Sequence, residues 1–562
     1  MMIRIKILLV IIFLASALIF ITPIIVAPIL CNKIAKELNE KYTDYIFKID
    51  KVHLSLIPSE LKLNMITIYS KAGYAGDSDL TGKIVSIQIV GIKFINAIFK
   101  NKYDIDKIII SNSLVEGKVP LQANEKPQTV FPLNIHIENL LFDHINISLK
   151  DTTSAQMFLV KNGILEIVDV NIAKHDTIGV FNRFDFESEQ FLSVSADSLY
   201  TYKARDIIYS DSLKSLSIDG LYITPNYNED AFTERLQYQT DRIEAVLSHV
   251  SCSHFHVEDY FQSGNLVISY IDIGNVDLNI FRDKRKKESN HVQPAFQNLI
   301  YNYPGLLRID SIGFKNGNIT YIEHAKKANE SGRVSLNKLK STIYNITNDT
   351  IFKTKDASME MMAEALLMGK SKMTVSLKAK LFDKSNTFSM TGTLAEIDIK
   401  ELNPILEKNA SIFANSGNIN KMNFNFTAND TKATGQMIML YKGLDLGINN
   451  KQSNESKTLK ARIITFIANE GVWNSNPTPG DEVRVGIIDF KNDPSKFIVN
   501  YCVKSIISGI KSSIIKVPMK KKKNFLQKIF SRGQGKQKNA NKIDEMSIPF
   551  NHFGKAEENM TG

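Results

Sequence analysis

Residues 373–381 read MTVSLKAKL, with an apolar residue at every second position. Successive side chains of an extended strand point to opposite faces, so this spacing puts all the apolar side chains on one face. Alternation with a period of two is typical of a half-buried strand rather than a helix. The residues on the apolar face are Met373, Val375, Leu377, Ala379 and Leu381.

The same alternation recurs along the chain, and helical spacing occurs only between the alternating blocks. Helical patterns are found at 399–406, at 459–468 and in the long segment 494–515. No Pro/Gly/Ser-rich linker divides the body, and its two weak breaks are 284–290 and 449–457. We therefore predict two β regions, 32–283 and 284–516, the second ending in a helix. The clearest alternating groups outside 373–381 are Val52, Leu54 and Leu56; Ile145, Ile147 and Leu149; Met422, Phe424 and Phe426; and Leu444, Leu446 and Ile448.

Part of the sequence is repeated. IHIENLLFDHINISLKD (135–151) aligns without gaps to LRIDSIGFKNGNITYIE (307–323), and ISYIDIGNVDLNIF (268–281) shares the arrangement 41 residues before the second copy. An Asn or Gly between two apolar alternating runs indicates a two-strand hairpin. We therefore predict a mainly β fold, an elongated, curved antiparallel sheet with a groove-like apolar face, a few short helices and a C-terminal helix.

The N-terminus carries an apolar run, ILLVIIFLASALIFITPIIVAPILC (7–31). As a helix its 25 residues would reach about 37 Å, which exceeds a hydrocarbon core of about 30 Å. We predict a transmembrane anchor at 1–31, with the N-terminus in the cytoplasm and the body across the membrane. A signal peptide cleaved after 15–17 (ASA) is the alternative.

The net charge of +10 is concentrated near the C-terminus. Nine basic and no acidic residues lie between 517 and 543, so the rest of the chain is nearly neutral and carries no basic stripe for a nucleic-acid duplex. The tail 517–562 is either a disordered solubilising segment or a short helix at a membrane surface. The candidates for membrane contact are Lys520, Lys521, Lys522, Lys523, Phe525 and Lys528.

The one-faced strands must bury their apolar sides, and two arrangements satisfy this. Two sheets can close on each other as a sandwich core, or one curved sheet can line a groove for acyl chains. Periodicity does not separate these alternatives, because both are apolar inside and polar outside. The groove candidates are Met373, Val375, Leu377, Ala379, Leu381, Met422, Phe424 and Phe426.

The order of these segments resembles that of the AsmA-like family. The membrane helix followed by KIDKVHLSLIPSELKLNMITI (48–68) resembles the start of such proteins, and 307–323 resembles their recurrent strand–NG–strand unit. FSMTGTLAEIDIKELNPIL (388–406), SGNINKMNFNFTAND (416–430) and GQMIMLYKGLDLGI (435–448) follow the family's closing order. The resemblance covers most of 5–516 and departs at 152–206 and in the tail. It implies a protein of the Gram-negative inner membrane with its body in the periplasm, which moves phospholipid or assists outer-membrane assembly.

Chemical motifs are scarce. The sequence has no nucleophile elbow, phosphate-binding loop, dinucleotide fingerprint or HExxH motif, so we expect neither an enzyme nor a cofactor. Cys252, His254, His256 and Glu258 would share one face of an extended strand, but alternate residues of one strand seldom converge on a single ion. We interpret them as ordinary polar side chains, with a metal site as the alternative.

The expected function is therefore passive handling of phospholipid or other acyl lipids in the cell envelope, with the inner membrane and an outer-membrane assembly partner as contacts. A scaffold that carries no lipid is the first alternative. A hydrolase without a recognisable motif is the second.

Overall fold

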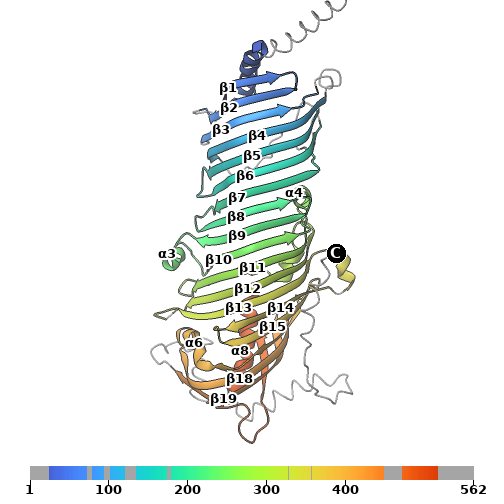
Figure 1. Cartoon of the computed structure of the whole chain (residues 1–562). Coiled ribbons are helices and arrows are strands. Elements are labelled where there is room, and N and C mark those ends of the chain that lie inside the picture. Colours follow the sequence, from blue (N-terminus) through green and yellow to red (C-terminus); the bar gives the residue numbers. More distant parts are fainter. Residues whose placement is uncertain are drawn as a thin grey trace, which may run out of the picture. The chain divides into compact units, whose positions relative to one another are not determined.

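The computed structural model describes residues 24–71, 79–93, 102–119, 134–173, 179–326, 328–355, 357–448 and 471–516. Every strand among them belongs to one 20-stranded sheet. Strands pair with their neighbours in the chain from β1 to β20, except that β17 is a short strand beside β18, and β16 also pairs with β18. The sheet is long and open, and its strands stack in chain order (Figure 1).

The strand bounds are β1 Tyr45–Ser55, β2 Glu60–Ser70, β3 Asp79–Val90, β4 Lys102–Val119, β5 Asn134–Asp151, β6 Met157–Ile172, β7 Arg183–Val194, β8 Tyr200–Ser210, β9 Ser215–Pro225 and β10 Asp241–Ser253. The second half contains β11 Leu266–Asp283, β12 Leu307–His324, β13 Gly332–Thr347, β14 Ser358–Leu367, β15 Ser371–Lys380, β16 Phe388–Leu394, β17 Ile397–Asp398, β18 Ile412–Ala428, β19 Lys432–Ile448 and β20 Val485–Lys491.

The prediction of a mainly β chain is confirmed. The MTVSLKAKL segment forms most of β15, where Leu377 and Ala379 are buried and Ser376 and Lys378 are exposed. The segment 152–206, where the family pattern fades, also contains sheet strands, from β6 into β8. The sheet runs on across the predicted boundary at 283/284, because β11 pairs with β12 along its whole length.

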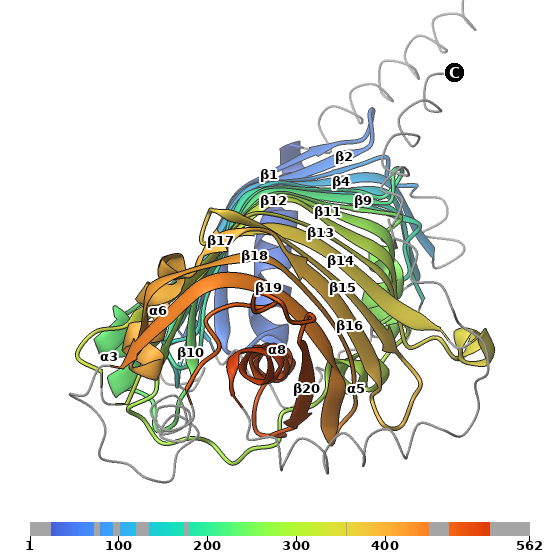
Figure 2. The same ribbon diagram turned by 90° about the horizontal axis from the view of Figure 1, so that it is seen from below.

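The prediction of a wholly antiparallel sheet is wrong at two places, because β4 pairs with β5 and β11 pairs with β12 in parallel. A parallel pair needs a connection that returns the chain to the starting edge. Between β11 and β12 this connection is 284–306, which contains α5 (Phe296–Tyr301). Phe296 and Ile300 of α5 pack against the main core, so the connection crosses one face of the sheet (Figure 2).

The predicted hairpins at 135–151 and 307–323 are also wrong, because each segment is one continuous 18-residue strand, β5 and β12. The third copy lies in β11, and Leu266 is paired with Leu307, an offset of 41 residues. The repeat spacing therefore equals the register of the parallel pair. Matching residues stand side by side in it, and the side chain of Asn316 donates to that of Asn275 at 3.0 Å.

The strands bend where single residues adopt a left-handed backbone. Met65, Asn112 and His144 have φ of 50°, 53° and 57°, and pairing places Asn112 beside His144 in adjacent strands. Asp206 and His249 continue such bends in β8 and β10, with φ of 50° and 53°. Asn, Asp and His tolerate this conformation better than most residues, and an irregular residue bends its strand. Aligned bends of this kind account for the arch of the sheet in Figure 2.

Helices lie beside the sheet and against one of its faces. Residues 24–41 form a helix next to β1. The others are α3 (Glu229–Glu234), α4 (Val257–Ser263), α5, α6 (Asn403–Ala410) and α8 (Ile498–Ile514), with 3₁₀ turns η1 (Thr350–Lys355) and η2 (Ile399–Leu402). The predicted helices at 399–406 and 494–515 correspond to η2 with α6 and to α8. The predicted helix at 459–468 lies outside the described residues.

Two hydrophobic clusters are buried. The larger joins β14–β20 to α8 and includes Leu377, Phe424, Met437 and Tyr501. The smaller contains Cys252, Ile268, Leu307 and Ile309 and lies beside α5. The covered core is therefore concentrated towards the C-terminal strands.

Most of the predicted membrane anchor, 1–23, lies outside the described residues. Among the residues that the structure does describe, no helix is both long and apolar enough to cross a bilayer. The anchor at 1–31 stays a prediction.

Candidate functional site

One row of apolar side chains runs across the sheet. Residues that face each other in adjacent strands project on the same side, so the row can be followed from pair to pair. We call it the inner row. It takes one residue from every strand except β17: Val52, Leu63, Ile87, Ile110, Phe142, Leu165, Phe186, Tyr209, Leu216, Cys252, Ile271, Ile312, Ile343, Met361, Leu377, Met390, Phe426, Gly435 and Ile488.

The inner row lies on the concave face. Its last members, Leu377, Phe426 and Ile488, belong to the same buried cluster as Tyr501 and Cys502 of α8. Figure 2 shows α8 beneath the arch of the sheet, so the side chains that contact α8 point into the concavity. Facing pairs carry this assignment back to β1. The concave face therefore presents an apolar residue at this register on nearly every strand.

The inner row is more accessible in the first strands than in the last. From β1 to β7 its members are half-buried, apart from Leu63, which is 8% exposed. A second apolar row runs beside it through these strands, so that the apolar surface is at least two side chains wide. The second row consists of Leu54, Leu61, Ile89, Ile108, Leu140, Ile167 and Phe184.

The predicted groove residues come together at the covered end. Leu377, Ala379, Leu381, Met422, Phe424 and Phe426 are all buried in the larger cluster, with Met373 and Val375 packed against it. At this end the sheet is closed by a helix, which is neither of the two alternatives that periodicity left open. The accessible part of the concave face lies in the earlier strands, which the groove candidates did not include.

Two glycines let α8 approach the sheet closely. A Cβ on Gly509 would lie 2.8 Å from Cγ1 of Ile488, and a Cβ on Gly486 would lie 2.6 Å from the carbonyl oxygen of Gly509. Real Cβ atoms do not approach other atoms so closely, so larger residues at either position would push α8 off β20. The buried face of α8 is accordingly built from Tyr501, Cys502, Ser505, Gly509 and Ser513.

Side chains occupy both edges of the sheet. The backbone N–H groups of Ile487 and Asp489 on β20 donate to the hydroxyls of Ser512 and Ser508 on α8, at 2.9 and 3.3 Å. At the opposite edge, the N–H of Phe47 donates to Oδ1 of Asn39, whose Nδ2 donates back to the Phe47 carbonyl, at 2.8 and 3.0 Å. These bonds satisfy edge groups that would otherwise be free to pair with another chain.

A cleft of about 690 Å³ lies between the helix 24–41 and the second half of β1. Its lining includes Ile24, Ala27 and Pro28 from the helix and Val52 and Leu54 from β1. Val52 and Leu54 are the first members of the two apolar rows. The cleft therefore joins the accessible concave surface to the helix that contains the last residues of the predicted anchor.

The Cys/His group at 252–258 does not share one face. β10 ends at Ser253, His254 has a φ of 55°, and α4 begins at Val257. Cys252 is a buried member of the inner row, and burial raises the pKa of its thiol to about 11. No group of three His, Cys, Asp or Glu side chains suited to a metal ion occurs within the described ranges. The cysteines at 31, 252 and 502 are all free thiols.

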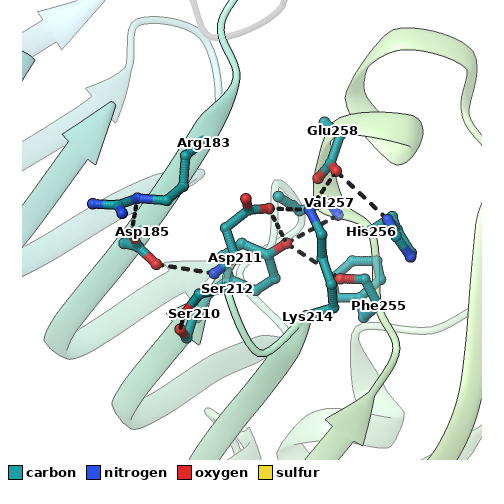
Figure 3. Close-up of polar contacts among 11 residues, drawn as sticks. Arg183, Asp185, Ser210, Asp211, Ser212, Lys214, Phe255, His256, Val257 and Glu258 are labelled. Atoms are coloured by element: carbon teal, nitrogen blue, oxygen red, sulfur yellow. Dashed lines mark hydrogen bonds and ion pairs between the residues drawn. The ribbon is translucent and has the colours of Figure 1, made fainter. Parts of the chain in front are cut away.

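His256 and Glu258 instead belong to a polar network that fixes α4 to the turn between β8 and β9 (Figure 3). Lys214 Nζ contacts Asp211 and lies 2.7 Å from Oε1 of Glu258. Burial lowers the pKa of Lys214, but its bonds to the two carboxylates outweigh burial and raise it overall. The Tyr209 hydroxyl donates to the Phe255 carbonyl at 3.2 Å, and burial raises the pKa of Tyr209 to about 12. Lys214 therefore links α4 to the turn between β8 and β9, which is a structural role.

The tail residues proposed for membrane contact, Lys520, Lys521, Lys522, Lys523, Phe525 and Lys528, lie outside the described residues. Their role stays a prediction.

Comparison of the chain with protein-family models and with curated proteins finds no match. The AsmA-like resemblance therefore depends on the sequence pattern alone, and the structure shows a long, open, mixed sheet without assigning a family.

Proposed function

We propose that this chain binds the acyl chains of phospholipid or other acyl lipids along its concave face and carries them away from the inner membrane. The protein would be held there by the predicted anchor, with its body in the periplasm. Head groups would stay in water while acyl chains slide along the apolar rows. No bond is made or broken, so the proposal needs no catalytic residue.

The observation that carries the proposal is the inner row. Apolar side chains left half-buried along successive strands cost free energy in water, at about 25 cal/mol for each Å² of exposed apolar surface. A sandwich would cover such a surface with a second sheet, whereas every strand among the described residues belongs to the one sheet. Acyl chains are ligands that would recover this free energy.

The position of the cleft beside helix 24–41 supports the same proposal. The start of both apolar rows lies next to the last residues of the predicted membrane anchor. By resemblance to AsmA-like proteins, the destination would be the outer membrane, in lipid homeostasis or assembly.

The test uses two neighbouring isoleucines on β4. Ile110 lies in the inner row, and Ile109 projects from the opposite face; both are half-buried. Ile110→Glu and Ile109→Glu introduce the same charge on the same strand, so their effects on strand stability should be similar. Lipid that co-purifies with the full-length chain, counted by mass spectrometry, should fall for Ile110→Glu only.

Equal lipid content in the two variants would contradict the proposal. Absence of lipid from the wild-type protein after incubation with vesicles would favour the scaffold alternative.

A further inference from the structure

Two lysines of α8, the helix that lies beneath the arch of the sheet (Figure 2), have no counter-charge among the described residues. Lys504 and Lys511 are seven residues apart, which places them on the same flank of the helix, about 10 Å apart along its axis. Both side chains are half-buried. In the part of the chain that the structure describes, neither has a carboxylate oxygen within ion-pair distance. By contrast, Lys284, which acts electrostatically on Lys504, is paired with Glu323.

The carboxylate that acts on Lys504 is already engaged. Glu323, at the end of β12, accepts from Lys284 at 2.7 Å, from Asn409 at 2.6 Å and from the Tyr321 hydroxyl at 2.8 Å. Glu323 therefore gives Lys504 only partial compensation, while Lys284 repels it.

The protonation behaviour of both lysines agrees with this geometry. Burial lowers the pKa of Lys504 first, repulsion from Lys284 lowers it further, and Glu323 opposes both effects. Burial and then repulsion from Lys504 lower the pKa of Lys511 to about 8. A half-buried ammonium group without a partner is stabilised by any anion that reaches it.

We propose that Lys504 and Lys511 bind the phosphate of an anionic phospholipid head group. This inference rests on the proposed function and names the lipid class. Each lysine has a flexible four-carbon stem, so both ammonium groups can turn towards one phosphate. The helix that carries them lies beneath the arch of the sheet (Figure 2), so a lipid on the concave face can present its head group to this helix. Zwitterionic lipids add a positive group beside the phosphate and fit the pair less well.

The test measures preference rather than total binding. Full-length protein in a phosphorus-free detergent is incubated with vesicles that contain equal amounts of phosphatidylglycerol and phosphatidylcholine, and bound lipids are counted by native mass spectrometry. The wild type should favour phosphatidylglycerol by about tenfold or more, as expected for charge-assisted hydrogen bonds. The variant Lys504→Met with Lys511→Met should carry both lipids nearly equally. Lys491→Met, at an exposed position on β20, should keep the wild-type ratio.

A change of pH gives an independent readout. Lysine binds an anion while protonated, so the preference should be full at about pH 7 and should fall as the pH rises through the pKa of Lys511. The charged groups that face this site are Lys504, Lys284 and Glu323. Of these, Lys504 also has a lowered pKa and reinforces the fall. Replacing both α8 lysines by arginine should preserve the preference at about pH 9.5, because arginine stays charged there.

The outcomes distinguish the lysine site from lipid binding on the concave face. If the wild-type protein carries both lipids equally, or if the methionine variant keeps the preference, the lysine site is overturned but lipid binding on the concave face is not. Protein that carries no lipid overturns both. Inorganic phosphate that binds in calorimetry to a protein without lipid preference would assign the lysines to a free anion and overturn the head-group site.

Discussion

Replacing Leu377 by glutamate tests whether α8 covers the concave face at the C-terminal end of the sheet. Leu377 is 7% exposed and lies in the apolar cluster with Tyr501 and Cys502 of α8. Loss of its apolar contacts costs about 2 kcal/mol. A carboxyl group that stays protonated costs about 1.36 kcal/mol for each pH unit by which the solution exceeds its ordinary pKa of about 4.3. At pH 7 this cost is about 3.7 kcal/mol. The total of about 6 kcal/mol approaches the whole stability of many domains.

The penalty depends on pH in a definite direction. The pKa of the new carboxyl is raised in the folded chain, whereas in the unfolded chain it ionises above about 4.3. Destabilisation therefore grows as the pH rises and falls to about 3 kcal/mol in total at pH 5. Ser376→Glu is the matched control, because Ser376 is the preceding residue of β15 and is exposed on the other face.

The single tryptophan provides the assay. Trp473 packs against the same cluster, and its backbone N–H donates to Ile514 at the end of α8, at 2.8 Å. Urea unfolding followed by Trp473 emission should give a much lower midpoint for Leu377→Glu than for Ser376→Glu at pH 7, with the gap narrowing at pH 5. Equal midpoints, or a gap independent of pH, would refute the reasoning and indicate that this face is open to water.

Three further predictions concern α8 and the buried cysteines. Gly509→Ala should lower the free energy of unfolding by about 1–3 kcal/mol in the same fluorescence assay, because a methyl group has no room between α8 and β20. An unchanged midpoint would mean that α8 does not pack against β20 as described. Ser508→Ala with Ser512→Ala should cost about 1 kcal/mol for each lost hydrogen bond and promote self-association through β20, measured by sedimentation; a monomer as stable as the wild type would contradict it. Cys252 and Cys502, whose pKa values burial raises to about 11 and about 12, should resist thiol reagents at pH 8 until urea is added; rapid labelling of the native chain would show them to be accessible.

The strand content could be predicted because period-two alternation is a local signal. In β15 and β18 the alternation of burial follows the alternation of residue type almost position by position. The repeat at 268–281 and 307–323 was also visible, but its meaning was not. A spacing of 41 residues can arise from duplication or from a parallel register, and the sequence does not distinguish them.

The predicted hairpins failed for a physical reason. Asn and Gly interrupt alternation both at a chain reversal and at a bend inside one strand. His144 in β5 shows the second case, with a positive φ and no reversal. The segments before and after the interruption are each long enough to be a strand. Their length therefore does not distinguish a hairpin from one bent strand.

The candidate site was only partly predictable. The predicted groove residues lie in one buried cluster, but α8, which covers them, has an apolar pattern equally suited to a core or to a membrane surface. The inner row of β1–β7 depends on register between strands, which no single segment contains. The alternating pattern also did not predict that β10 ends at Ser253. His256 therefore lies just before α4 instead of in the strand.

The strands are paired in chain order, so the length of the sheet can change by whole pairs of strands. Each strand contacts mainly its chain neighbours, as units do in repeat proteins, so an added or deleted antiparallel pair leaves distant strands undisturbed. Strands are about 4.8 Å apart, so each such pair would change the span by about 10 Å. The edge bonds of Asn39 and of α8 would keep their partners in every such variant. Gain or loss of pairs of strands would therefore change the length of the sheet between two constant ends.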